Sequence, residues 1–374
     1  MLIIILFYIL TIGSFLLYSY FLIDPNITFF NHPIWSWFLE RVLQLGYHNR
    51  QLSWQIYFVL VFLLFIFNYL FIKNYKKISP IKLALLIAVL LLFSYPFLSH
   101  DFLKYMFDAK ILTLYHKNPY LTPPVDLSFD RWLRFMQWIE QPFRYGPVFL
   151  LIAIVPSFLA WGKFSLSFIF FKITFAIFYL LAVYFLNKMN RRWAVIFATN
   201  PLILIDGLIN SHNDIIAVSL LIIGLYLLFK KKILSRVFLF LSVGIKYLTL
   251  PSLFLSSNKK SVINKFIFVS FIILPFSLLN KQVGDFFMAE IHTLYFIVLL
   301  GFLPFYEEII TRLNIFFFGL LMCYYPFIRL GNWISFNNLS VKHLIILSFS
   351  IINLLFFFVV PKWRTALLDF IKLK

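Results

Sequence analysis

The chain has 374 residues, of which 62% are hydrophobic and only 13% charged, and 51 of them are phenylalanine. A surface of this composition could not be solvated by water, so an ordinary soluble domain is excluded. The sequence instead predicts an all-α, polytopic membrane protein. The formal net charge of +19 would suit nucleic acid, but the Lys and Arg residues lie in short clusters beside apolar runs. That pattern indicates positive-inside topology and contact with anionic membrane lipids, with no nucleic acid as partner.

The apolar runs predict a single integral-membrane domain over residues 1–374 with about ten transmembrane helices. The runs stand at 1–23, 54–72, 81–98, 147–161, 164–187, 262–279, 293–305, 313–330 and 341–360. The first has no basic n-region and no small-residue cleavage site, so we expect it to be retained as a span. Residues 233–257 are expected to form two short helices that meet near Lys246, because this cation interrupts the run and Pro251 follows it.

The distribution of cations predicts the orientation in the cell membrane. Four lysines crowd the loop after the second run, whereas the charges of residues 24–53 are balanced. That loop and the N-terminus should therefore be cytoplasmic, with residues 100–146 and 211–214 on the outer face. Residues 147–187 must then cross the membrane an odd number of times, so one of their two runs is re-entrant or broken, or a third short crossing is hidden.

The first polar island begins immediately after the third run, at residues 99–108. Asp101, Tyr105 and Asp108 stand at i, i+4 and i+7, so in a helix they share one face. The free N–H groups and the positive dipole at a helix start keep a carboxylate there ionised. An ionised Asp101 facing an acceptor oxygen is a candidate general base. For either acid alone, the simpler interpretation is a polar rim where a membrane helix meets water.

The second polar island runs from Asn200 to Asp214 and contains Asp206, Asn210 and His212. An acid within an apolar run is costly in lipid, so Asp206 should face a cavity or a partner. The alternative is a helical hairpin whose polar tip, residues 210–214, is simply hydrated. One His with scattered acids lacks the close spacing of a metal site, so no metal ligand is assigned.

Several cations are expected on the same side of the membrane as the two islands. Arg144 precedes the Pro-started run at 147 and is well placed to bind a phosphate bidentately. Lys246 lies between apolar helices, where only an anion or a buried acid would accommodate it. For Lys104, Arg131 and Arg134 we favour aliphatic stems along the membrane interface with the charges in water.

Taken in order, these residues resemble the sequence pattern of the GT-C superfamily of glycosyltransferases. Within that superfamily they are most similar to the pattern of the bacterial polyprenol-phosphate-mannose-dependent mannosyltransferases. The match covers about 95–257, with outer loop 100–146, and leaves 258–374 as additional spans. The matching residues are Asp101, Tyr105, Asp108-Ala109-Lys110, Asn118-Pro119-Tyr120, Tyr145-Gly146-Pro147, Asn200-Pro201-Leu202, Asp206-Gly207, His212-Asn213-Asp214 and Lys246-Tyr247. Ala109, Lys110 and Gly146 depart from the Gly, Arg and Pro of the pattern.

The resemblance implies an inverting transfer of a hexose from a polyprenyl-phosphate sugar to a lipid or glycan acceptor on the outer face. Asp101 would remove the acceptor proton, with Asp108 as the second catalytic carboxylate, and mannose is the sugar that the analogy favours. No cofactor is assigned, and a divalent cation is left open. The implied substrate-binding residues are Tyr105, Asn118, Tyr120, Arg144, Tyr145, Asp206, His212, Asn213, Asp214 and Lys246.

The competing class is a polytopic transporter or lipid flippase of a cell-envelope precursor, which would also be basic and rich in spans. Transporters tend to show paired repeats and broken helices in corresponding halves, and neither pattern is visible in this sequence. The acids also gather in one outer loop instead of at mid-membrane. A purely structural scaffold would not need Asp206 or Lys246.

Overall fold

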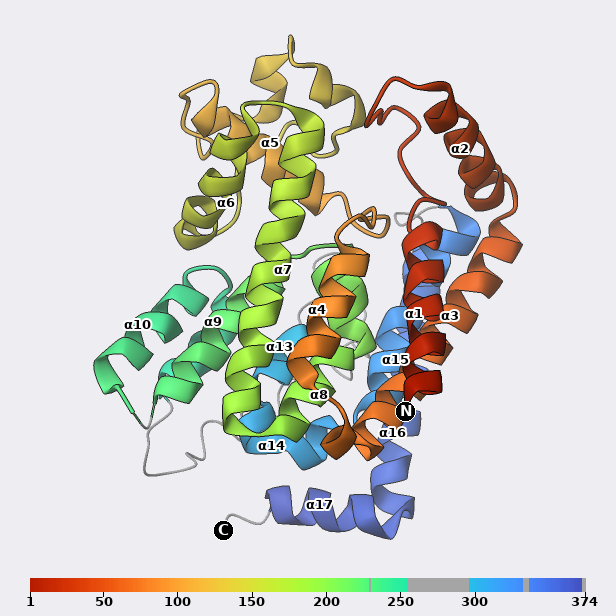
Figure 1. Cartoon of the computed structure of the whole chain (residues 1–374), viewed down its shortest axis with the longest axis vertical. Helices are drawn as coiled ribbons and strands as arrows, with labels where there is room; N and C mark the ends of the chain where they lie inside the picture. The colour runs from red at the N-terminus through yellow and green to blue at the C-terminus, as the bar shows by residue number, and fades with distance from the viewer. Residues whose placement is uncertain (229, 255–295, 332–335, 372–374) are drawn as a thin grey trace.

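The computed structural model describes residues 1–228, 230–254, 296–331 and 336–371 (Figure 1), and every regular element in these ranges is helical, which confirms the all-α prediction. The elements are α1 (Leu2–Tyr18), α2 (Pro33–Leu43), η1 (Gln44–His48), α3 (Arg50–Lys73), η2 (Tyr75–Lys77), α4 (Pro80–Leu91), α5 (Asp101–Thr113), η3 (Pro124–Leu127), η4 (Arg131–Phe135), α6 (Pro147–Ala160), α7 (Phe164–Met189), α8 (Arg191–Thr199), η5 (Ile203–Ile209), α9 (Asp214–Leu227), α10 (Lys232–Val243), η6 (Tyr247–Phe254), α13 (Ile297–Gly301), α14 (Leu303–Ile310), α15 (Asn314–Met322), η9 (Pro326–Leu330), α16 (Phe336–Val359) and α17 (Pro361–Ile371). The run predicted at 262–279 lies outside the described residues.

The predicted number of about ten spans is not confirmed. Among the described residues, three helices are long and apolar enough to cross a membrane, namely α3, α7 and residues 340–359 of α16. Two bent pairs bring the number to five if each pair is one span: α8 with η5, at 68°, and α14 with residues 314–330, at 84°. The apolar helices α1, α4, α6 and α9 are shorter than the usual span length.

Helix α7 runs from one end of the bundle to the other (Figure 1). At its start Phe164 packs on Trp132 and Phe135 of η4, with ring centroids 5.4 and 4.9 Å apart. At its far end α8 begins, and Nε of Arg191 donates to the carbonyl oxygen of Ile78, 2.9 Å away, just after η2. Helix α6 is only about 21 Å long, against about 30 Å for a bilayer core. Within residues 147–187, α7 alone therefore has the length of a full crossing.

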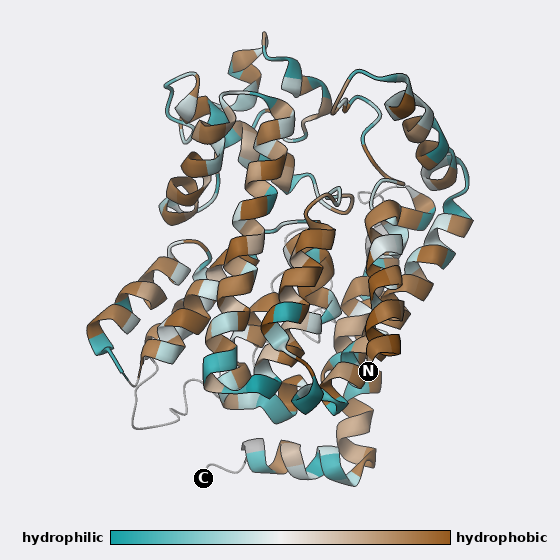
Figure 2. Ribbon diagram, viewed as in Figure 1, coloured by the Kyte–Doolittle hydropathy of each residue, from teal (hydrophilic) through white to brown (hydrophobic). Residues whose placement is uncertain are grey.

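Polar residues gather at that far end, where α7, α8 and α14 meet (Figure 2). Glu307 of α14 joins the elements there: its carboxylate lies 2.9 Å from the guanidinium of Arg192 and accepts a 2.6 Å hydrogen bond from the indole of Trp193. The helices are mostly apolar between this end and the end that carries α5. The two polar ends are thus separated by an apolar layer, as expected of a membrane protein.

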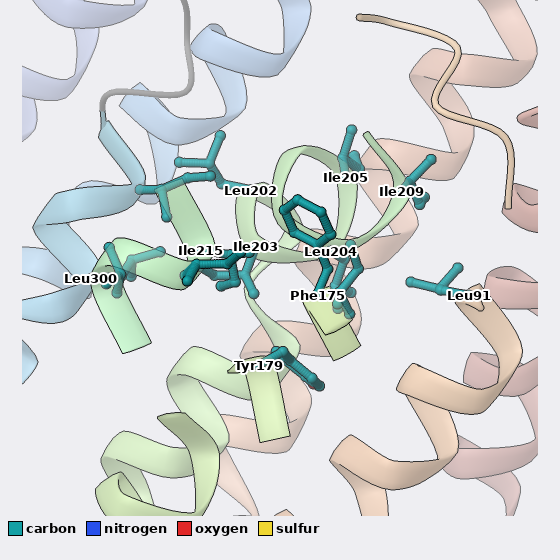
Figure 3. Close-up of a cluster of buried hydrophobic side chains, with 14 of the residues drawn as sticks. Leu91, Phe175, Tyr179, Leu202, Ile203, Leu204, Ile205, Ile209, Ile215 and Leu300 are labelled. Atoms are coloured by element: carbon teal, nitrogen blue, oxygen red, sulfur yellow. The ribbon is translucent and has the colours of Figure 1, made fainter. Parts of the chain in front are cut away.

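The break between α8 and η5 lies in the middle of the hydrophobic core. Asn200 precedes Pro201, which disfavours a helical backbone at Asn200, and the Asn200 side chain accepts a hydrogen bond from the amide of Leu202, 2.9 Å away. The next turn is buried against α4, α7, α9 and α13 (Figure 3). The side chains that surround it are Leu91, Phe175, Tyr179, Ile215 and Leu300. The broken span is thereby fixed inside the bundle, and its end delivers residues 210–214.

Candidate active site

Helix α5 begins at Asp101, as the sequence predicts. The amide of Asp101 donates to the hydroxyl of Ser99, 3.2 Å away, and the carboxylate lies in the first turn of the helix. Its side chain is 23% exposed, whereas the rest of the helix from Phe102 to Ile111 is buried. Asp101 is thus an accessible carboxylate at the positive end of a buried helix, where an ionised form is favoured.

The two polar islands meet at this helix start. Oδ1 of Asn210 accepts a 3.1 Å hydrogen bond from the amide of Leu98, although 112 residues separate them in the chain. Nδ1 of His212 lies 3.4 Å from Oδ2 of Asp101. His212 is buried, and within the described part of the chain its Nε2 atom has no hydrogen-bond partner. The second island is therefore not a hydrated hairpin tip; it is buried against the first.

A second helix, α9, begins at the same place with Asp214. Its carboxylate is fully buried, and Oδ2 lies 3.2 Å from Nζ of Lys246. Lys246 stands at the junction of α10 and η6, which confirms the predicted break there. Asp214 is thus the buried acid that accommodates Lys246. Two helix starts, each carrying an Asp, face one site that also holds a cation.

Asn213 lies between these groups and is fully buried. Among the described residues, neither its amide nitrogen nor its side-chain oxygen has a hydrogen-bond partner. Leaving a buried polar group unpaired costs about 1–3 kcal/mol, so such groups call for a functional explanation. Together with Nε2 of His212, they are polar atoms that the described part of the protein leaves unpaired beside Asp101.

The turn Asn118-Pro119-Tyr120 is bound to the end of the outer loop. Oδ1 of Asn118 accepts from the amide of Tyr120 at 3.0 Å, and the Tyr120 hydroxyl donates to the carbonyl oxygen of Tyr145 at 3.0 Å. The Tyr145 ring packs edge-on against Tyr105 of α5, with centroids 4.9 Å apart. The predicted residues Tyr105, Tyr120 and Tyr145 are therefore connected in one aromatic group on α5 and the outer loop, and Asn118 holds the turn that carries Tyr120.

Arg144 and Lys246 lie on two chain segments that touch. A Cβ atom placed on Gly146 would meet the carbonyl oxygen of Gly244 at 1.8 Å, so only glycine permits this approach. Arg144 is exposed and Lys246 has a side chain that is 16% exposed. Each cation stands two residues from the contact. The structure therefore brings both predicted phosphate-binding cations to neighbouring segments.

The expectation that Lys104 lies in the membrane interface is wrong. Lys104 is buried and donates to Oδ1 of Asp108 and to the carbonyl oxygen of Gln141, each at 2.8 Å. The two residues stand at i, i+4 on the inner face of α5, where each charge neutralises the other. Burial raises the pKa of Asp108 to about 6, and the contact with Lys104 limits the rise. Arg131 and Arg134 are exposed.

A model of the family described as alpha-(1->6)-mannopyranosyltransferase, N-terminal domain, matches residues 31–256. The match spans more than half of the chain and contains every candidate site residue from Asp101 to Lys246. The chain belongs to this family. It is therefore a glycosyltransferase, and the resemblance to GT-C mannosyltransferases is confirmed. Neither the curated proteins nor the solved structures contain a match to it.

The segment beyond the family match also reaches the site. Oδ1 of Asp206 accepts hydrogen bonds from the hydroxyl of Tyr324 at 2.8 Å and from the side-chain Nδ2 of Asn210 at 3.1 Å. Asp206 therefore links the C-terminal helices to Asn210, which holds Leu98 in front of Asp101. The sequence contains no motif that predicts the role of Tyr324, because the contact depends on tertiary packing.

Lys110 holds the outer loop in place. Its Nζ lies 2.5 Å from Oδ2 of Asp130 and 3.9 Å from the centroid of the Trp132 ring. Tyr115 donates to the same carboxylate oxygen at 2.6 Å. This buried cluster fixes η4 against α5. Across the described ranges, no three His, Cys, Asp or Glu side chains are grouped as they would be around a metal ion.

Proposed function

We propose that the protein transfers mannose from a polyprenyl-phosphate mannose to a hydroxyl group of a lipid or glycan acceptor on the outer face, with inversion at C1. Asp101 is the general base. The observation that carries the proposal is the pairing of the accessible Asp101 carboxylate with buried His212 at the start of α5. The family description, alpha-(1->6)-mannopyranosyltransferase, supports mannose as the transferred sugar and a 6-hydroxyl group as the acceptor.

In the proposed reaction, Asp101 takes the proton of the acceptor hydroxyl as that oxygen attacks C1 of the mannose. The new C1–O bond forms while the bond from C1 to the phosphate oxygen breaks, and polyprenyl phosphate leaves with the electron pair. Positioned proton transfer of this kind typically contributes about 10²- to 10⁴-fold in rate. His212 holds the carboxylate in one orientation, 3.4 Å away.

Negative charge grows on the leaving phosphate, so fixed positive groups nearby lower the barrier. Lys246 and Arg144, on segments in backbone contact at Gly146 and Gly244, are the candidates for this role. Asp214 holds Lys246 at 3.2 Å, and the starts of α5 and α9 add the positive ends of two helix dipoles.

Recognition of the sugar is assigned to the buried groups that protein atoms do not satisfy. Asn213 presents an amide nitrogen and an oxygen, and His212 presents Nε2. A site built to hydrogen-bond hydroxyl groups rejects analogues that lack them, because its buried polar atoms would then stay unpaired. A deoxy-mannose donor should therefore be a poor substrate.

The proposal is tested with purified protein, polyprenyl-phosphate β-mannose labelled in the sugar, and an acceptor that ends in mannose. We expect one polyprenyl phosphate to be released for each labelled acceptor, with an α-(1→6) bond detected by NMR. A β-linked product would contradict inversion. Translocation of intact donor across vesicles without release of phosphate would instead identify a lipid flippase.

A further inference from the structure

Lys172 lies in the first half of α7, with 2% of its surface exposed. Its Nζ donates three hydrogen bonds: to the carbonyl oxygens of Ile209 at 2.6 Å and Leu208 at 2.9 Å, and to the hydroxyl of Ser94 at 3.2 Å. A lysine ammonium group has three N–H donors, so all are used. Among the described residues no carboxylate pairs with it. A lysine inside a membrane helix is costly, and such residues mark functional positions.

The three oxygens belong to the ends of two elements. Leu208 and Ile209 close the broken span at η5, and the last carbonyl groups of a helix have no partner within that helix. Ser94 lies just beyond α4, and its hydroxyl donates to the carbonyl oxygen of Leu91 at 2.7 Å. Lys172 therefore caps the end of η5 and is also bound to the segment that follows α4.

These two ends lead directly to the two halves of the active site. The chain leaving η5 continues to Asn210 and His212, and the chain leaving α4 continues to Leu98 and Asp101. The two chains then touch through the Leu98–Asn210 hydrogen bond and the Asp101–His212 contact. Lys172 is thus bonded to both segments just before they meet.

We propose that Lys172 is a positioning residue. It holds the segments that follow α4 and η5 in a fixed relative position, so that His212 contacts Asp101. It does not touch the reacting groups. Its effect on turnover rests on the proposed function, whereas its effect on the two segments does not. Loss of its three hydrogen bonds should loosen the segments that follow the two elements, while most of the bundle stays intact.

The experiment measures amide hydrogen exchange and steady-state kinetics of the purified full chain for Lys172→Met. Exchange in residues 95–101 and 208–214 should rise about tenfold or more, because local opening becomes easier there, with α3 unchanged. The kcat value should fall about 10- to 100-fold while the donor KM changes less than about threefold. Lys188→Met, at the exposed end of the same helix, is the matched control and should behave as wild type.

Two further variants decide the question if Lys172→Met does not fold. Ser94→Ala removes the link from Lys172 to the segment after α4, together with the Ser94–Leu91 hydrogen bond, and leaves the bonds from Lys172 to Leu208 and Ile209 in place. Exchange should therefore rise in residues 95–101 and not in 208–214. Lys172→Arg keeps the donors and should restore most of the turnover. Unchanged exchange in both segments of every variant would overturn the proposal. If the wild-type protein transferred no mannose, the proposed function would fail, and the exchange data would still decide the role of Lys172.

Discussion

A Cβ atom on Gly146 would lie 1.8 Å from the carbonyl oxygen of Gly244, so the backbones of the two segments are in direct contact. The GT-C sequence pattern that this chain resembles has Pro at the position of Gly146. A Pro ring could not be accommodated in this contact without movement of the backbone. The contact joins the end of the outer loop to the junction of α10 and η6. It thereby brings together the two segments that carry Arg144 and Lys246.

Gly146→Ala should impair binding of the donor. The added methyl group meets backbone and not a flexible side chain, so the segments must separate, at a cost of about 1–3 kcal/mol. We expect the donor KM to rise about tenfold or more. Gly13→Ala is the control, because a Cβ atom at Gly13 meets nothing within 4 Å. Equal donor KM values for the two variants would show that the contact does not shape the site.

Arg144 and Lys246 should each contribute to affinity for the donor phosphate. Hydrogen bonds to charged groups are worth about 1.5–3 kcal/mol, so Arg144→Gln and Lys246→Gln should each weaken donor binding about 10- to 100-fold. Arg131→Gln, which changes an exposed cation of η4, is the control. Donor affinity is measured by titration of labelled lipid, with thermal stability checked in parallel because Lys246 also neutralises Asp214. Wild-type donor affinity in both variants would show that these cations do not bind the donor phosphate.

Asp108 should make stability depend on pH. Burial raises its pKa from 3.8 to about 6 in the folded protein. The protonated form is therefore favoured by folding, and this stabilisation is present below about pH 4 and lost as the pH rises through 6. The difference of about two pKa units corresponds to about 3 kcal/mol. Asp108→Asn keeps an acceptor for Lys104 but does not titrate.

The test for Asp108 compares denaturation of the wild type and Asp108→Asn between pH 4 and 7. The wild type should lose stability relative to the variant over that range, with the midpoint of the loss between the two pKa values. Parallel curves would mean that the carboxyl group is not perturbed by its burial.

Some of the site could be predicted from the sequence because the determining signals are local. Asp101 follows an apolar run and precedes a helical pattern, which fixes its place at a helix start. Lys246 interrupts an apolar run before a Pro, which predicts the break there. The pairing of Lys104 with Asp108 carried a signal too, since i, i+4 opposite charges can neutralise each other on a buried face. On the buried face of α5, this pairing outweighs the tendency of Lys to extend to water.

Other parts of the site depend on contacts between distant segments. Two of these contacts are the approach of Gly146 to Gly244 and the hydrogen bond from Tyr324 to Asp206. Both follow from the packing of the helices, which cannot be read from a single sequence. Lys172 had a signal, namely a charge within an apolar run, but its partners are backbone carbonyl groups that carry no sequence pattern. The number of spans could not be predicted because short and bent helices give the same hydropathy as full crossings.

Residues 100–146 should lie on the outer face and Lys231 in the cytoplasm. The cation clusters at 76–77 and 191–192 lie together at the far end of α7, which fits one cytoplasmic side. Asp126→Cys should react with an impermeant maleimide in intact cells, whereas Lys231→Cys should react only after permeabilisation. Both positions are exposed, and the native Cys323 is buried, so background labelling should be low. Labelling at position 231 in intact cells would contradict the predicted orientation.

The central claim is that Asp101, and not Asp108, removes the acceptor proton. The decisive measurement is the turnover of Asp101→Asn and Asp108→Asn, assayed side by side at equal folded amounts with the same donor and acceptor. Asp101→Asn keeps the size of the side chain but not its basicity, so it should lose about 10²- to 10⁴-fold in kcat while it still binds donor. Asp108→Asn should lose less, because the amide can still accept from Lys104. Near-normal turnover of Asp101→Asn together with an inactive Asp108→Asn would contradict the assignment.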